Sequence, residues 1–161
     1  MKIHAWFGLA AVMAAALGVA ACSNGTTVAG GVTQVVSTTS FGMCAGYCKT
    51  RLEISEGQAV LVREAWGRGA GQNLPEQRTT AALGAGEWQE IARLAAAAQI
   101  DGLPDVIGCP DCADGGAESL SIVGPKRNKT ITFDHGAKVE EAQPLLDRVR
   151  AVRARMLPPQ Q

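Results

Sequence analysis

The stretch "CKTRLEISEGQAVLVREAW", residues 48–66, carries the alternating pattern of a β-hairpin. From residue 50 to 55, Thr, Leu and Ile alternate with Arg, Glu and Ser, which is typical of a strand with one buried face. Glu56-Gly57 predicts the turn, and "QAVLVREAW" returns as the partner strand. This hairpin predicts an antiparallel sheet.

Other segments extend the same pattern. The preceding residues 32–44, "VTQVVSTTSFGMC", are rich in β-branched side chains and also predict strand. Residues 67–77, "GRGAGQNLPEQ", predict a Gly-rich loop. Residues 117–124 and 128–134, "AESLSIVG" and "NKTITFD", predict two further strands joined by a turn.

Two helices are expected. Residues 86–100, "GEWQEIARLAAAAQI", repeat apolar side chains at a spacing of three to four, and Asp101-Gly102 and Pro104 end this helix. The second is expected over residues 140–156, with acidic residues at its start and four arginines near its end: Arg148, Arg150, Arg153 and Arg155. We interpret these arginines as a solvated face, with an anion-binding patch as the alternative.

Together these elements predict an α+β fold, with a single antiparallel sheet, two helices on one face and the order β-β-α-β-β-α. The segments expected along the chain are a signal peptide at 1–21, a lipidated flexible tether at 22–31, one α+β domain at 32–157 and a disordered tail at 158–161.

The N-terminus indicates export. Lys2 precedes an apolar run from Trp6 to Ala21, which is shorter than the roughly 20 apolar residues of a membrane span and suits a secretory signal. "VAAC", residues 19–22, resembles the bacterial lipobox, in which the cysteine is acylated and becomes the new N-terminus. We therefore expect Cys22 to anchor the protein to a lipid bilayer. Ser23 at the next position favours the outer membrane.

Composition limits the partners. Fifteen Lys and Arg balance fifteen Asp and Glu, so no long-range field favours nucleic acid or anionic lipid. Aromatic residues make up 4% of the chain, which argues against a stacking platform for single-stranded nucleic acid. We expect no nucleic-acid partner and no cofactor, and the oligomeric state stays open.

Four cysteines beyond Cys22 leave three chemistries open. Cys44, Cys48, Cys109 and Cys112 are an even set in an exported domain, which favours two disulfides without deciding among three pairings. A redox couple at Cys109 and Cys112 is the enzymatic alternative, although Asp111 between them would oppose activation of a thiol. Four thiolates could instead hold Zn²⁺.

Acidic residues surround the second cysteine pair. They could gather around Ca²⁺, or they could serve as turn and capping residues: Asp101, Asp105, Asp111, Asp114 and Glu118. His135, in "FDHG", is interpreted as a surface residue rather than a general base. No residue is assigned a catalytic or metal-binding role.

Residues 41–47, "FGMCAGY", followed by the hairpin, resemble a domain-of-unknown-function family of small bacterial envelope lipoproteins that open with an aromatic-Gly-x-Cys-Pro-x-Tyr strand. The resemblance extends over about residues 38–156, and the block at 103–118 is similar to a subset of such proteins with extra cysteines. Ala45 replaces the usual Pro, and Cys48, Cys109 and Cys112 exceed the core pattern. The resemblance implies an envelope location and brings no activity or catalytic residues.

These observations predict a non-enzymatic envelope lipoprotein that is stabilised by disulfides and acts as a binding or structural accessory module. The expected contact surface is the sheet face without helices or the loop Gly67–Asn73, and the expected partner is an envelope protein or the cell wall. A thiol–disulfide redox protein and a zinc- or calcium-binding module are the alternatives.

Overall fold

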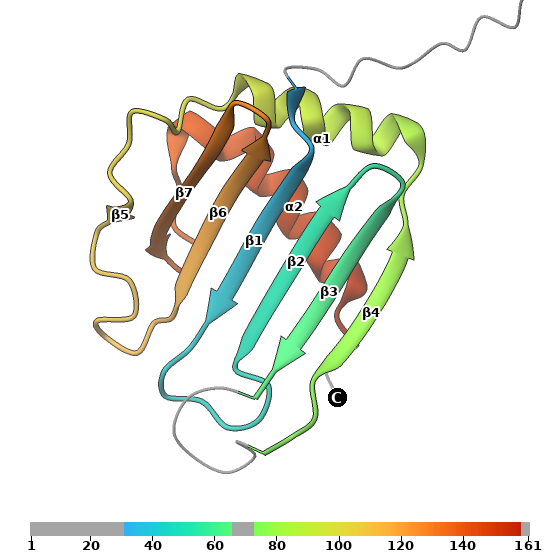
Figure 1. Ribbon diagram of the computed structural model, residues 1–161. Coiled ribbons are helices and arrows are strands. Elements are labelled where there is room, and N and C mark those ends of the chain that lie inside the picture. Colours follow the sequence, from blue (N-terminus) through green and yellow to red (C-terminus); the bar gives the residue numbers. More distant parts are fainter. Residues whose placement is uncertain (1–30, 66–72, 159–161) are drawn as a thin grey trace, which may run out of the picture.

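One seven-stranded mixed sheet with two helices forms the fold (Figure 1). The computed structural model describes residues 31–65 and 73–158. The strands before the first helix are β1 (Gln34–Ser40), β2 (Lys49–Ser55), β3 (Gln58–Glu64) and β4 (Gln77–Ala82). The later elements are α1 (Ala85–Ala97), β5 (Val106–Ile107), β6 (Ala117–Gly124), β7 (Arg127–Asp134), the 3₁₀ helix η2 (Glu140–Ala142) and α2 (Gln143–Met156).

The sheet is organised around its first strand. The spatial order is β4-β3-β2-β1-β6-β7-β5, so β1 joins the β2–β3–β4 meander to the β6–β7 hairpin. Val35 of β1 lies opposite Ile54 of β2 on one side and opposite Ile122 of β6 on the other. All neighbours run antiparallel except β5 and β7, which pair in parallel.

The predicted order β-β-α-β-β-α and the single antiparallel sheet are therefore wrong. Among the described residues, four strands precede α1, three lie between α1 and α2, and the sheet is mixed. β4 overlaps the end of the predicted loop and lacks alternation, because it is an edge strand whose residues are almost all exposed. β5 has two residues, too few to produce a periodic signal.

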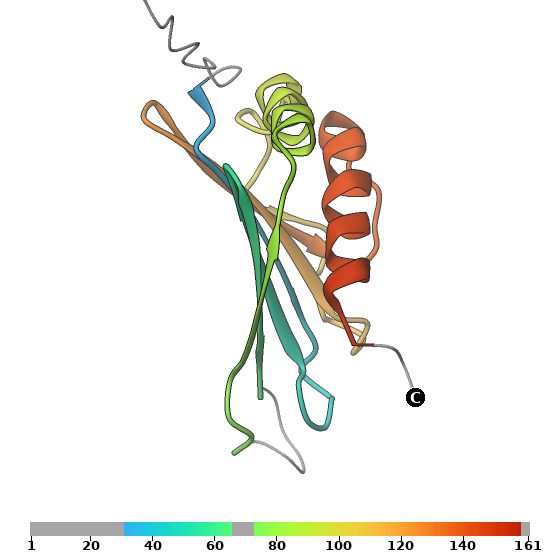
Figure 2. The same cartoon turned by 90° about the vertical axis from the view of Figure 1, so that its right-hand side faces the viewer.

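Both helices cover the same face of the sheet (Figures 1 and 2). α1 buries Trp88, Ile91, Ala92 and Ala95, and it ends at Ala97, earlier than expected. Ile100, three residues beyond the end of α1, is fully buried in the core.

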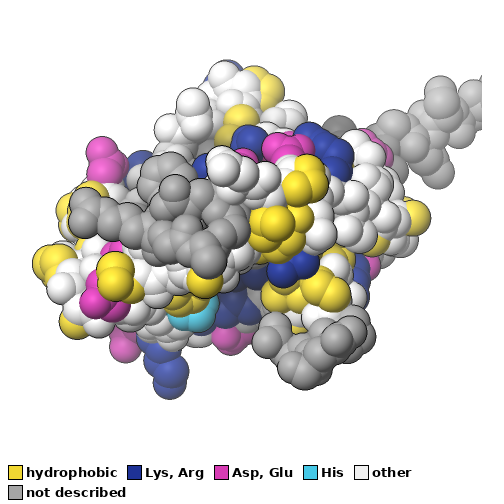
Figure 3. Space-filling view, turned by 90° about the horizontal axis from the view of Figure 1, so that it is seen from below, with side chains coloured by type: hydrophobic (Ala, Val, Ile, Leu, Met, Phe, Trp, Pro, Cys, Tyr) yellow, Lys and Arg dark blue, Asp and Glu magenta, His cyan; other side chains and the backbone are white. Residues whose placement is uncertain are grey.

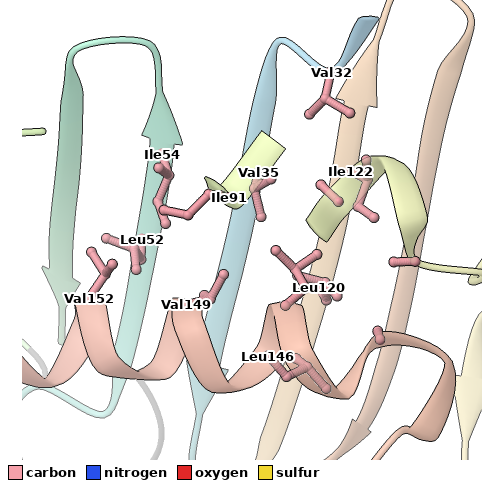
Figure 4. Close-up of a cluster of buried hydrophobic side chains, with 14 of the residues drawn as sticks. Val32, Val35, Leu52, Ile54, Ile91, Leu120, Ile122, Leu146, Val149 and Val152 are labelled. Atoms are coloured by element: carbon pink, nitrogen blue, oxygen red, sulfur yellow. The ribbon is translucent and has the colours of Figure 1, made fainter. Parts of the chain in front are cut away.

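The core lies between this face and the helices (Figure 4). Alternate residues of β2 and β6, Leu52 and Ile54 and Leu120 and Ile122, are fully buried there. α2 adds four apolar side chains from one stripe: Leu145, Leu146, Val149 and Val152. Full burial of one such side chain contributes roughly 1.5–3 kcal/mol, so this layer supplies most of the hydrophobic stabilisation.

No helix in the described ranges is long and apolar enough to cross a bilayer.

Replacement of Leu52 by Ala tests the position of the core. Leu52 is fully buried, so the variant should lose about 2–5 kcal/mol in free energy of unfolding. Arg51→Ala is the matched control, since the neighbouring side chain points to the opposite face and is exposed; it should change stability by less than about 1 kcal/mol. Chemical denaturation without reductant measures both, and equal losses would contradict the assigned face.

Candidate functional site

Both pairs of cysteines lie at one end of the sheet. The loop from β1 to β2 contains Cys44 and Cys48, and the loop before β6 contains Cys109 and Cys112. Ser40, at the end of β1, lies opposite the first residue of both β2 and β6. The antiparallel pairing of β1 with both neighbours therefore brings the two loops together, at the lower end in Figure 1.

The cysteines form two local disulfides, Cys44–Cys48 and Cys109–Cys112, among the three possible pairings. The Cα atoms are 5.6 and 5.5 Å apart, within the usual range for a disulfide. The sulfurs are thus divided between two loops, whereas a zinc site would need them in one cluster. In the described segments, no group of three or more His, Cys, Asp or Glu residues could hold a metal ion.

Asp111 connects the two disulfide loops. Its Oδ2 accepts a hydrogen bond from the backbone N–H of Gly42 at 3.0 Å, and its Oδ1 accepts one from Gly116 at 2.9 Å. A Cβ atom at Gly42 would lie 2.7 Å from Oδ2, so a side chain there would displace the Asp111 carboxylate. The backbone of Asp111 has φ of +63°, a left-handed conformation that Asp tolerates better than most residues. We call these two hydrogen bonds the Asp111 clamp.

An aromatic contact supports the clamp. The ring of Phe41 packs edge-on against the ring of His135, with centroids 4.8 Å apart. A side chain at Gly116 would collide with the Phe41 ring, and the backbone N–H of His135 donates to the carbonyl of Gly116. His135 is exposed, as expected, but it also helps to position the loop.

The first disulfide loop is also tied to the segment before β4. The Tyr47 hydroxyl donates to the carbonyl of Pro75 at 2.8 Å, and the Arg63 guanidinium lies 4.6 Å from the Tyr47 ring centroid. Two large hydrophobic side chains stay exposed near these contacts, Met43 at 67% and Leu74 at 41%. Figure 3, which views this end, shows hydrophobic patches between charged side chains. We call the surface formed by residues 41–48, 73–76 and 108–116 the disulfide end.

A buried ionic cluster lies between the sheet and α2. Glu118 of β6 is 1% exposed, and its carboxylate pairs with Arg150 at 2.8 Å and Arg153 at 3.1 Å. Arg153 also donates to the hydroxyl of Ser37, and Arg150 donates to the carbonyl of Ala137. Burial would raise the pKa of Glu118, but the hydrogen bonds and charges of the two arginines outweigh burial and hold it below the ordinary value.

This cluster corrects the interpretation of the helix arginines as a solvated face. Arg150 and Arg153 bind Glu118, while Arg148 and Arg155 pair with Glu87 of α1 at 3.0 and 2.6 Å. The hydrogen bond from Arg155 is the main reason why the pKa of Glu87 is lowered. These arginines therefore hold α2 to the sheet and to α1.

The acidic residues considered for calcium do not gather. Asp101 pairs with Arg127 at 2.8 Å and Asp105 pairs with Lys129 at 2.6 Å, away from the Asp111 clamp and the Glu118 cluster. The sequence did not reveal the clamp, because Gly42 and Asp111 lie 69 positions apart. Its only local signal was an Asp in a turn rich in Gly and Pro. Cys22 and most of the Gly67–Asn73 loop lie outside the described residues.

Comparisons with known proteins assign no family. No protein-family model matches the chain, and a search of curated proteins finds no similar sequence. The resemblance to envelope lipoproteins therefore stays a hypothesis based on the 41–47 motif. The structure places this motif in the loop after β1, where it contributes Phe41, Gly42 and Cys44 to the disulfide end.

Glu118→Gln tests the buried cluster. Loss of the carboxylate charge leaves two arginines without their anion, so the variant should be about 3–5 kcal/mol less stable at pH 7. The folded-state pKa is lowered, so the wild-type contribution is complete above the unfolded value of about 4.3 and is lost as the pH falls through the folded value. The difference in free energy of unfolding between the wild type and the variant should therefore become smaller below about pH 4.

Denaturant titrations from pH 3 to pH 8 measure this difference. Glu140→Gln is the control, because its side chain is exposed and the variant should match the wild type at every pH. A Glu118→Gln variant that keeps wild-type stability at pH 7 would contradict the assigned pairing.

Asp111→Ala tests the clamp. Two partly buried backbone donors lose their acceptor, so the free energy of unfolding should fall by about 1–3 kcal/mol, and Asp111→Asn should lose less stability. Asp114→Ala is the matched control: Asp114 also has a positive φ, of +54°, but its side chain forms no hydrogen bond among the described residues. Chemical denaturation without reductant compares the stability of the three variants. Equal losses of stability for Asp111→Ala and Asp114→Ala would assign the effect to backbone strain instead of the clamp.

Proposed function

We propose that the chain is a lipid-anchored, non-enzymatic module of the bacterial cell envelope that presents its disulfide end to a protein or cell-wall partner. The "VAAC" sequence at 19–22 supports acylation of Cys22, and Ser23 supports the outer membrane. The two disulfides support an oxidising compartment, since disulfides persist there and are rare in the cytosol.

The single observation that carries this proposal is the polarity of β1. The chain enters the described fold at Gly31, beside the β6–β7 turn, where the N–H of Thr33 donates to the carbonyl of Val123 at 2.8 Å. The disulfide end lies at the other end of β1, whose seven residues span roughly 20 Å at about 3.3 Å per residue. A tether from Cys22 would therefore attach at one end of the sheet and leave the disulfide end facing away from the membrane.

The surface at the disulfide end suits recognition of a partner. Its loops are held by two disulfides, the Asp111 clamp and the Tyr47–Pro75 hydrogen bond, so little conformational entropy would be lost on binding. Exposed Met43 and Leu74 provide apolar contact area, and Tyr47 with Arg63 provides the residue types that often dominate binding energy.

Site-specific photo-crosslinking in the native host tests this function. A photoreactive amino acid at residue 43 of the full chain should form a discrete adduct with an envelope protein or with peptidoglycan. The same amino acid at exposed residue 126, in the turn beside Gly31, should not. In a Cys22→Ser variant the protein should leave the membrane fraction and the adduct at residue 43 should weaken. Equal adducts at residues 43 and 126, or a Cys22→Ser protein that stays membrane-bound, would overturn the proposal.

A further inference from the structure

The two disulfides differ in how easily another thiol can reach them. Cys109 and Cys112 are both exposed, whereas Cys48 is 2% exposed and Cys44 is half-buried. Thiol–disulfide exchange begins when a thiolate attacks a disulfide sulfur, so its rate depends on access to that sulfur. The Cys109–Cys112 pair is the one that a second protein can approach.

The backbone conformation around the two disulfides also differs, and this difference too favours exchange at Cys109–Cys112. Cys48 directly precedes β2, and its carbonyl accepts a hydrogen bond from the N–H of Phe41 at 3.0 Å. The Cys109–Cys112 turn contains Asp111 in the left-handed conformation, closed by a hydrogen bond from the N–H of Cys112 to the carbonyl of Cys109. Non-Gly residues adopt this conformation rarely, and Asp111 stays in it while the disulfide and the clamp hold the turn.

We infer that Cys109–Cys112 is a thiol-exchange site for a dithiol protein of the cell envelope, and that its reduction releases the Asp111 clamp. This inference rests on the proposed envelope location for its partner. The clamp joins the two loops of the disulfide end through the hydrogen bond from Gly42, and the hydrogen bond from Gly116 orders the second loop itself. Its release would therefore change the surface that we propose for partner binding.

The dithiol supplies the electrons and protons that reduce the Cys109–Cys112 disulfide. A thiolate of the dithiol attacks one sulfur of the pair, the Cys109–Cys112 bond breaks, and a mixed disulfide forms while the other sulfur leaves as a thiolate and takes up a proton. The second thiol of the dithiol, once deprotonated, attacks its own bridged sulfur. Cys109 and Cys112 are then both thiols, and the dithiol protein leaves as a disulfide, having given two electrons and two protons.

Exchange with reduced thioredoxin, used as a dithiol probe on the full chain purified in detergent, tests the inference. After alkylation and peptide mass analysis, Cys109 and Cys112 should become labelled at least tenfold faster than Cys44 and Cys48. A thioredoxin variant without its second cysteine should be captured on Cys109 or Cys112, and a Cys109→Ser/Cys112→Ser double variant should capture none. Equal labelling of both pairs, or no labelling before denaturant is added, would overturn it.

Amide hydrogen exchange tests the coupling separately. Selective reduction should accelerate exchange at Gly42 and Gly116 at least tenfold and leave Leu52 of β2 unchanged. Asp111→Ala, which keeps the disulfide, should accelerate the same two amides without reduction, and unchanged protection of Gly42 after reduction would contradict the coupling. An absent adduct at residue 43 would contradict the proposed function and leave this chemistry in place, whereas equal labelling of the two disulfides would contradict only the exchange site.

Discussion

The enclosure of the Glu118 carboxylate between the sheet and α2 is the constraint on which the packing of the C-terminal helix depends. A charge removed from water costs several kcal/mol unless its partners are in place. Arg150 and Arg153 are three residues apart and therefore lie on one side of α2, where both can reach the same carboxylate. The same orientation of α2 that brings both arginines to Glu118 also places Val149 and Val152 in the core.

The same constraint stabilises the disulfide end. Glu118 is the second residue of β6, two positions after Gly116. Gly116 packs against the ring of Phe41, and its N–H donates to Asp111. Arg150 also holds the carbonyl of Ala137, in the chain that follows β7 and His135. The ionic cluster thus holds the start of β6, directly after the second disulfide loop, and the disulfides and the Asp111 clamp hold the two loops themselves. A surface built in this way has its shape before any partner arrives.

The sequence predicted those elements whose side chains face a core in a regular pattern. The β2–β3 hairpin, β6 and β7 all lie where alternation predicted strands, and α1 and α2 lie where apolar spacing predicted helices. β4 was missed because its edge position exposes both faces, and with it the strand order was wrong. The disulfide pairing stayed open because four cysteines allow three pairings, and their spacing in the sequence does not choose among them. The structure closes both bridges within single loops. The sequence indicated a solvated face for Arg150 and Arg153 and a calcium, turn or capping role for Glu118. Nothing local to each residue indicates a partner more than thirty positions away.

We propose that two locally closed disulfide loops, held together at the end of the sheet opposite Gly31, form the recognition surface of a protein that is lipid-anchored through Cys22. Peptide mapping by mass spectrometry of the full chain, isolated from the envelope without reductant or chelator, tests it most directly. We expect Cys44 bridged to Cys48, Cys109 bridged to Cys112, and an acylated Cys22 at the N-terminus. A bridge between the two loops, or four reduced cysteines with bound zinc, would contradict it.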